Sequence, residues 1–283
     1  MTSFDPADPR SRLNNLAQHW RVEIERILET ENSVVALGRR DDRSVVLKLH
    51  RQRGDERLSA TVIRAFCGNG MVRIIDDVDG ALLLERLTPG TSLVTMVMSG
   101  HDNDATEILA DVIRRMTPRD CPSAPTVEVW GHSFARYRTL DDRPLPETLV
   151  EEAHRVYDTL ATTQRRRRLL HGDLHHGNVL RDSERGWLAI DPKGVIGEAE
   201  YEIGAALRNP IEKAESFLQP ETIQARVECF ADRLHLDADR IVAWAFAQAV
   251  LSVVWLIEDG FAVDDENPWL QLARSIRPLL KRP

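Results

Sequence analysis

The sequence predicts an α+β fold with two lobes, a small antiparallel sheet with one helix followed by a mainly helical lobe. Short β-prone runs dominate the chain up to residue 87, whereas apolar residues recur at helical spacing beyond it. The period changes at Thr88-Pro89-Gly90, a turn-forming segment. We therefore expect an N-terminal lobe of residues 1–87 and a C-terminal lobe of residues 88–283, which suits the length of the chain.

Three runs in the N-terminal lobe are rich in β-branched and other apolar residues. They predict strands at residues 33–37, 44–49 and 81–85. The polar segment 39–43 separates the first two runs and predicts a hairpin turn. The first two strands should therefore pair antiparallel.

One amphipathic helix is expected between the second and third strands, at residues 55–66. Gly68-Asn69-Gly70 ends its pattern. Its apolar stripe consists of Leu58, Val62, Ile63 and Phe66. We expect this stripe to lie on the sheet.

Two long amphipathic helices are expected in the C-terminal lobe. The first follows the polar residues 102–104 and stops before Pro118, and the second follows the proline-rich segment 143–146. Their apolar faces consist of Ile108, Leu109, Val112, Ile113 and Met116, and of Leu149, Val150, Ala153, Val156, Tyr157 and Leu160.

Residues 241–257 are nearly all apolar and could be a core helix or a membrane span. Seventeen residues is the minimum length for crossing a bilayer. An apolar helix is also what the centre of a large helical domain uses. Because charged residues flank the segment closely, we predict a buried helix and no membrane contact.

Composition narrows the class of protein. The 42% hydrophobic and 29% charged content is typical of soluble globular chains, and the net charge of −8 argues against a general nucleic-acid binder. The basic run 165–168 is expected to be a solvated turn or to lie at the negative end of a helix dipole. Three widely spaced cysteines and an N-terminus without a signal-peptide pattern predict a cytoplasmic protein.

The most informative stretch is residues 169–180, in which a polar loop lies between two short apolar runs. Asp173 and Asn178 have the Asp-x4-Asn spacing in which a carboxylate takes the proton of an acceptor hydroxyl and an amide oxygen holds Mg²⁺. Asp191 follows the next apolar run and would be the second metal ligand. Mg²⁺ bound to a nucleotide needs only such a sparse pair of oxygen ligands.

These motifs resemble those of the aminoglycoside phosphotransferases. His171-Gly-Asp-Leu-His-His-Gly-Asn178, with Trp187-Leu-Ala-Ile-Asp-Pro192, is most similar to the branch that phosphorylates streptomycin at its 6-hydroxyl or phosphorylates hydroxyurea. The resemblance implies a bilobal protein-kinase-like fold, with ATP and Mg²⁺ between the lobes. It also implies that Asp173 is the catalytic base.

The resemblance assigns an ATP-binding role to five residues of the N-terminal lobe. Lys48 would contact the α and β phosphates, with Glu56 as its ion-pair partner. No glycine triplet precedes Lys48, so a turn ending at Ser33 would cover the phosphates through its backbone amides. The segment containing Glu85 and Leu87 would be the interlobe hinge that pairs with adenine.

The histidines of the loop admit two interpretations. His171 and His175 are four residues apart and could bind zinc from one helical face, as in a hydrolase. Gly172 and Gly177 make a continuous helix there unfavourable, and no glutamate follows the first histidine. We favour the role that the resemblance implies, in which His171 and His175 organise the catalytic loop.

The acceptor is expected to be a small cationic molecule, because aminoglycosides are polycations that favour carboxylates and aromatic faces. Candidate contacts are Glu198, Trp255, Glu258 and Asp259. The function predicted is ATP-dependent phosphorylation of a streptomycin-type aminoglycoside, conferring antibiotic resistance. Two alternatives stay open: a kinase of hydroxyurea or another small hydroxyl metabolite, and a catalytically silent nucleotide-binding protein.

Overall fold

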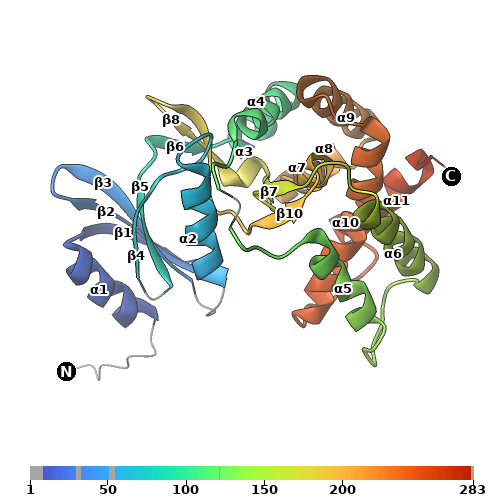
Figure 1. The fold of residues 1–283 in the computed structure, drawn as a ribbon, viewed down its shortest axis with the longest axis horizontal. Helices are drawn as coiled ribbons and strands as arrows, with labels where there is room; N and C mark the ends of the chain where they lie inside the picture. The colour runs from blue at the N-terminus through green and yellow to red at the C-terminus, as the bar shows by residue number, and fades with distance from the viewer. Residues whose placement is uncertain (1–8, 30–32, 51–54, 79, 121, 282–283) are drawn as a thin grey trace.

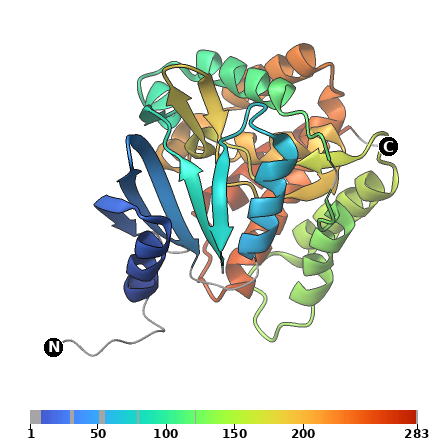
Figure 2. The same cartoon turned by 60° about the vertical axis from the view of Figure 1, so that its left-hand side comes forward.

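The structure is a computed structural model that describes residues 9–29, 33–50, 55–78, 80–120 and 122–281. A sheet with two helices forms one end of the molecule, and a larger helical body forms the other (Figures 1 and 2). This arrangement confirms the expected fold class. The lobe boundary at residue 87 stays a prediction, although the chain changes sheet close to it, between Glu85 and Pro89.

The N-terminal sheet has five antiparallel strands in the order β1-β2-β3-β5-β4. The strands are β1 (Glu23–Glu29), β2 (Ser33–Arg40), β3 (Arg43–His50), β4 (Ile74–Val78) and β5 (Ala81–Glu85). The three predicted strands and the hairpin are confirmed. The two edge strands, β1 and β4, were not predicted, because their exposed charged residues hide the two-residue period.

The two faces of this sheet belong to different cores. Alternation along β5 sends Ala81 and Leu83 toward α1 (Pro9–Trp20), whereas Leu82 and Leu84 face the other side. That second side is covered by α2 (Asp55–Phe66), as predicted, and its buried residues join the core of the helical lobe. The inner face of the sheet is therefore packed as one body with the lobe that carries the catalytic loop.

The helical lobe is built around one long apolar helix, α10 (Ala238–Glu258), which contacts five other helices. By length and composition α10 could cross a membrane, but 67% of its apolar window is buried inside the protein. This burial agrees with the prediction of a core helix. The other helices are α3 (Val94–Met98), α4 (Asp102–Arg115), α5 (Val127–Tyr137), α6 (Glu147–Thr162), α7 (Ala199–Leu207), α8 (Ala214–Phe217), α9 (Pro220–Leu234) and α11 (Pro268–Ile276).

Two small sheets hold the polar loop of residues 171–178. Strand β7 (Arg168–Leu170) enters the loop and pairs with β10 (Val195–Gly197). Strand β8 (Val179–Asp182) leaves it, between β6 (Pro89–Ser92) and β9 (Gly186–Ala189). Because both ends of the loop are fixed in ladders, its short 3-10 turn η1 (His176–Asn178) is rigidly placed.

One side chain ties the hairpin of β8 and β9 to the N-terminal sheet. Arg185 donates to the carbonyl oxygens of Gly68, at 2.6 Å, and Met71, at 3.0 Å, and it pairs with Glu85 at the end of β5. The basic run 165–168 also takes part in the structure, since Arg165 pairs with Asp237 at 2.9 Å.

Candidate active site

The loop of residues 171–178 is hydrogen-bonded to the segment that follows β9. The amide of Ile190 donates to the carbonyl of Asn178 at 2.9 Å, and the amides of Lys193 and Gly194 donate to the carbonyl of His171 at 3.0 and 2.8 Å. The predicted base and the predicted metal ligands are therefore carried by two backbone segments that fix each other.

His171 is a fully buried anchor of this loop. Its Nε2 donates to the carbonyl of Ile190 at 2.8 Å, and its Nδ1 accepts from the amide of Asp173 at 3.2 Å. We assign this tautomer from the partners. Burial lowers the pKa of His171 although Glu202 opposes the shift, so the ring is neutral. The geometry supports the scaffold role, because no ring nitrogen is left for a metal.

His175 and His176 also organise the turn. Nδ1 of His175 caps η1 by accepting from the amide of Gly177 at 3.1 Å. His176 is completely buried, and among the described residues neither of its ring nitrogens has a hydrogen-bond partner. The described residues also contain no group of three or more His, Cys, Asp or Glu side chains that could hold a metal ion. The zinc-hydrolase alternative gains no support.

Because of these three histidines, we expect the free energy of unfolding to fall in mild acid. Burial lowers the pKa of His171 and His175, and lowers that of His176 most. The unfolded chain therefore binds protons near pH 6.5 that the folded chain does not, and stability is lost as the pH falls below that value. The loss should be at most about 1.4 kcal/mol per pH unit for each histidine, or about 4 kcal/mol for three.

Urea unfolding between pH 7.5 and 5.5 measures this slope. The variant His176→Leu should unfold with one proton fewer taken up, and its slope should be correspondingly shallower. Equal slopes for the variant and the native protein would contradict the assignment of His176 as a neutral buried group.

Asp173 lies between two cations. Nζ of Lys193 is 3.1 Å from Oδ2, and Nη2 of Arg208 is 3.5 Å from Oδ1. Burial alone would raise the pKa of Asp173, but Lys193, His175 and Arg208 together hold it well below its ordinary value. The carboxylate is thus charged at neutral pH and available as an acceptor for a hydroxyl proton.

Asn178 and Asp191 present oxygen atoms on neighbouring segments. The side-chain amide of Asn178 donates to the carbonyl of Asp173 at 2.9 Å, which leaves its oxygen available as a ligand. Asp191 has a left-handed backbone, with φ of 60°, and pairs with Lys48 of β3. Burial would raise the pKa of Asp191, but Lys48 lowers it, so the carboxylate is charged. One amide oxygen and one carboxylate form a donor set that fits Mg²⁺ carried by a nucleotide.

The predicted nucleotide-binding residues are brought together only in part. Lys48 reaches Asp191 across the lobes, and Glu85 and Leu87 lie where the sheet meets the helical body. Ser33 opens β2 and is buried, while the rest of its turn lies outside the described residues. Glu56 is in the first turn of α2, but its side chain lies outside the described residues, so the expected ion pair between Lys48 and Glu56 stays a prediction.

The predicted substrate residues divide into two groups. Glu198 is 1% exposed, and its carboxylate accepts from Arg240 Nε at 3.0 Å and from Trp244 Nε1 at 2.6 Å. An internal carboxylate of this kind serves packing, so the geometry does not support a substrate contact for Glu198. The sequence could not reveal this, because its partners lie more than forty residues away on α10.

Trp255 is connected to the catalytic loop through Trp130. Its ring packs edge to face on Trp130, with centroids 5.6 Å apart, and its Nε1 donates to Ser133 Oγ at 2.8 Å. A Cβ atom on Gly172 would come within 2.9 Å of Trp130, so the two tryptophans extend from the loop toward the end of α10. Glu258 and Asp259 stand at that end. Glu258 is held by Arg136 at 2.8 and 3.1 Å, and Asp259 is exposed.

No contact with the catalytic loop was predicted for three side chains that the structure places there: Lys193, Arg208 and Glu202. Lys193 stands two residues after Asp191, a position the motif alone could have drawn attention to. Arg208 and Glu202 belong to α7 and its end, thirty or more residues from the loop they contact, and only the fold brings them there. The oxygens of Glu202 accept from the amides of His171, at 2.7 Å, and Gly172, at 3.0 Å.

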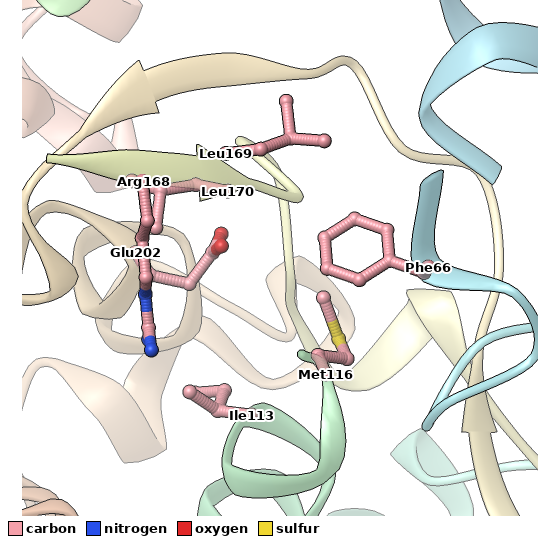
Figure 3. A pocket seen from close by; sticks show the side chains of 7 residues that line it. All are labelled: Phe66, Ile113, Met116, Arg168, Leu169, Leu170 and Glu202. Carbon is pink, nitrogen blue, oxygen red and sulfur yellow. The ribbon is translucent and has the colours of Figure 1, made fainter. Parts of the chain in front are cut away.

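Figure 3 shows the narrow space behind this contact, between β7, α4 and the end of α2. Seven residues line it: Phe66, Ile113, Met116, Arg168, Leu169, Leu170 and Glu202. It is a packing crevice with no room for a water molecule, so it is not a ligand site. Its apolar walls explain why burial raises the pKa of Glu202 despite the opposing influence of His171.

The fold is that of two-lobed small-molecule kinases. A solved structure of aminoglycoside phosphotransferase APH(4)-Ia, in a ternary complex with ADP and hygromycin B, superposes with a TM-score of 0.68 at 16% identity. It covers 94% of this chain and 98% of the other. Choline kinase LicA from Streptococcus pneumoniae superposes with a TM-score of 0.63 at 13% identity, covering 95% and 98%. The protein-kinase-like fold predicted from the motifs is thereby confirmed.

Residues 19–260 match the model of the family described as aminoglycoside/hydroxyurea antibiotic resistance kinase, and the chain belongs to this family. It is 30% identical to streptomycin 3''-kinase of Klebsiella pneumoniae, over 86% of this chain and 91% of the relative. It is 28% identical to streptomycin 6-kinase of Streptomyces griseus, over 80% and 75%. The chain is therefore a phosphotransferase that acts on a hydroxyl group.

Proposed function

We propose that this protein transfers the γ-phosphoryl group of ATP to a hydroxyl of a cationic, streptomycin-type aminoglycoside and so confers resistance to it. The observation that carries the proposal is a charged Asp173 in the same loop as Asn178, next to Gly172, which lies against Trp130 of the tryptophan pair. The relatives named above support the acceptor class. Such a reaction takes place where ATP is abundant, which favours the cytoplasm.

The nucleotide would occupy the space between the sheet and the loop. Lys48 would bind the phosphates, and Glu85 and Leu87 would border the adenine through their backbone. Asn178 and Asp191 would hold Mg²⁺, which neutralises charge on the phosphates when it is bound. The APH(4)-Ia structure, which shares the fold, is a complex with ADP and so supports nucleotide binding by this protein.

Asp173 would orient the acceptor hydroxyl and accept its proton. In phosphoryl transfer the protein contributes mainly positioning and electrostatic stabilisation, so a base with a lowered pKa is adequate. His171 fixes the backbone of Asp173, and Asn178 binds its carbonyl oxygen. The carboxylate is therefore held in place before any ligand arrives.

Trp130 and Trp255 would form the wall against which the acceptor lies. Tryptophan faces attract guanidinium groups, and Glu258 and Asp259 would add negative charge at the outer end of this wall. The phosphorylated hydroxyl of streptomycin would be the one at position 3'' or at position 6, because the relatives include both a streptomycin 3''-kinase and 6-kinases. A hydroxyurea phosphotransferase from Kitasatospora aureofaciens, 29% identical, keeps the smaller acceptor as the second candidate.

Neutralising Glu258 and Asp259 together tests the acidic end of the wall. The double variant Glu258→Gln/Asp259→Asn should raise KM for streptomycin by roughly five-fold, the effect of one or two exposed charge contacts, with kcat little changed. A matched control is Glu107→Gln/Asp111→Asn on α4, which removes the same charge far from the tryptophans. An unchanged KM in the first variant would remove these two residues from the acceptor site.

The proposed function is tested by coupled ADP release with Mg²⁺ and ATP. The acceptors are streptomycin, other aminoglycosides, hydroxyurea and simple sugars. Streptomycin-dependent release supports the proposal. Release with hydroxyurea or a sugar alone would replace the acceptor class, and absence of ADP release with every acceptor would favour the catalytically silent nucleotide-binding protein.

A further inference from the structure

The two cations beside Asp173 differ in their freedom to move. The side chain of Lys193 is 58% exposed, so it can exchange its ion pair for water or a ligand. The side chain of Arg208 is 7% exposed and cannot leave without abandoning a buried charge. Of the two oxygens of Asp173, Oδ1 is therefore held by a fixed partner and Oδ2 by a replaceable one.

Arg208 is itself held by the core helix α10. Its Nη1 donates to Oε1 of Gln248 at 3.1 Å, and Nε2 of Gln248 donates to the carbonyl of Tyr201 at 2.7 Å. Its own carbonyl accepts from Trp269 Nε1 at 3.2 Å. The guanidinium fork thus joins a side-chain amide at the centre of the lobe to the catalytic carboxylate.

The place of Gln248 depends on the absence of a side chain at Gly204. A Cβ atom at position 204 would come within 2.5 Å of the side-chain carbon and oxygen of the Gln248 amide. Gly204 has no positive φ and lies inside α7, where alanine has the higher helix propensity. Close packing against Gln248 is the physical reason for glycine here.

We propose that Arg208 is a positioning residue for phosphoryl transfer. Anchored by Gln248 over Gly204, it fixes Oδ1 of Asp173 so that Oδ2 faces the acceptor hydroxyl once Lys193 has moved away. The proposal rests on the assignment of Asp173 as the base. It adds a buried series of hydrogen bonds that leads from α10 to the reacting carboxylate. Nucleotide binding should not depend on these hydrogen bonds, because Arg208 and Gln248 bind Asp173 and Tyr201, whereas Lys48 pairs with Asp191.

Three variants test different points of this series of hydrogen bonds. Arg208→Ala should lower kcat by about 100-fold, the effect of misplacing a reacting group by about 1 Å, with KM for ATP unchanged. Arg208→Lys keeps the charge but not the fork, and should restore part of kcat. Gly204→Ala should lower kcat in the same way but less, by displacing Gln248, although it touches neither Asp173 nor Arg208. Guanidinium ion added to Arg208→Ala should raise kcat.

The matched control is Arg240→Ala. It removes from α10 an arginine whose side chain is 14% exposed and pairs with Glu198, so it should lower the melting temperature without changing kcat below that temperature. A crystal structure of Arg208→Ala should show the Asp173 carboxylate turned toward Lys193. Full kcat in Arg208→Ala or in Gly204→Ala would overturn the proposal, as would an unmoved carboxylate.

This outcome is separable from failure of the proposed function. If the native protein phosphorylates an acceptor other than streptomycin, the same kcat comparisons are made with that acceptor. If it phosphorylates none, the proposed function fails, whereas the carboxylate position in the crystal structure of Arg208→Ala still decides the positioning role.

Discussion

Replacing Asp173 with asparagine should remove nearly all phosphoryl transfer, a loss on the order of 10²–10⁴-fold in kcat. The amide has the shape of the carboxylate but cannot accept the hydroxyl proton. It also leaves Lys193 and Arg208 beside a neutral group, so the substitution removes the charge that orients the acceptor. The affinity for ADP should stay within a small factor of the native value, because Lys48, Asn178 and Asp191 are untouched.

Two measurements on the Asp173→Asn protein check this expectation. Coupled ADP release with the acceptor that the native protein uses gives the loss in kcat, and calorimetric titration with Mg²⁺ and ADP gives the affinity. Turnover within ten-fold of native would show that Asp173 is not the base. A loss of nucleotide affinity equal to the loss in kcat would show instead that the loop had lost its structure.

Replacing Glu202 with alanine should destabilise the protein by about 2–6 kcal/mol, since two buried amide donors lose their acceptor at about 1–3 kcal/mol each. These donors are the amides of His171 and Gly172, in the loop itself, so activity should fall with stability. Glu202→Gln retains one acceptor oxygen and should cost less. The free energy of unfolding in urea measures both variants.

Glu200, two residues earlier on α7, provides the control for this comparison. It is also buried, but within the described part of the chain its carboxylate accepts only a long hydrogen bond, 3.5 Å, from the amide of Asp237, so Glu200→Ala should cost much less than Glu202→Ala. Equal costs at the two positions would mean that the amides of the loop find another acceptor when Glu202 is removed.

The elements with a clear apolar period were predictable from the sequence. The helix at residues 55–66 and the strands before and after it have the predicted places, because burial of one face selects a regular spacing. The motif around Asp173 was recognisable because the chemistry requires its residues within one short loop. The edge strand β1 was not predictable, since its mostly exposed residues show no regular apolar spacing.

Contacts that join distant parts of the chain were beyond sequence reasoning. Nothing in the spacing of Glu198 distinguishes a carboxylate that binds Arg240 and Trp244 in the core from one that faces a substrate. Arg208 likewise has a role only because α7 passes beneath the catalytic loop. Such roles depend on the three-dimensional crossing of helices, which local patterns do not encode.

The ion pair between Lys48 and Asp191 makes nucleotide binding a competition. Each of these side chains is expected to serve a different part of the bound ligand, yet without ligand they neutralise each other across the lobes. On the proposed roles, the metal and the phosphates would displace this one intramolecular pair and form two intermolecular contacts. Because both new contacts require breaking the same ion pair, the metal and the phosphates should bind cooperatively. The protein should therefore bind a nucleotide without its metal ion only weakly.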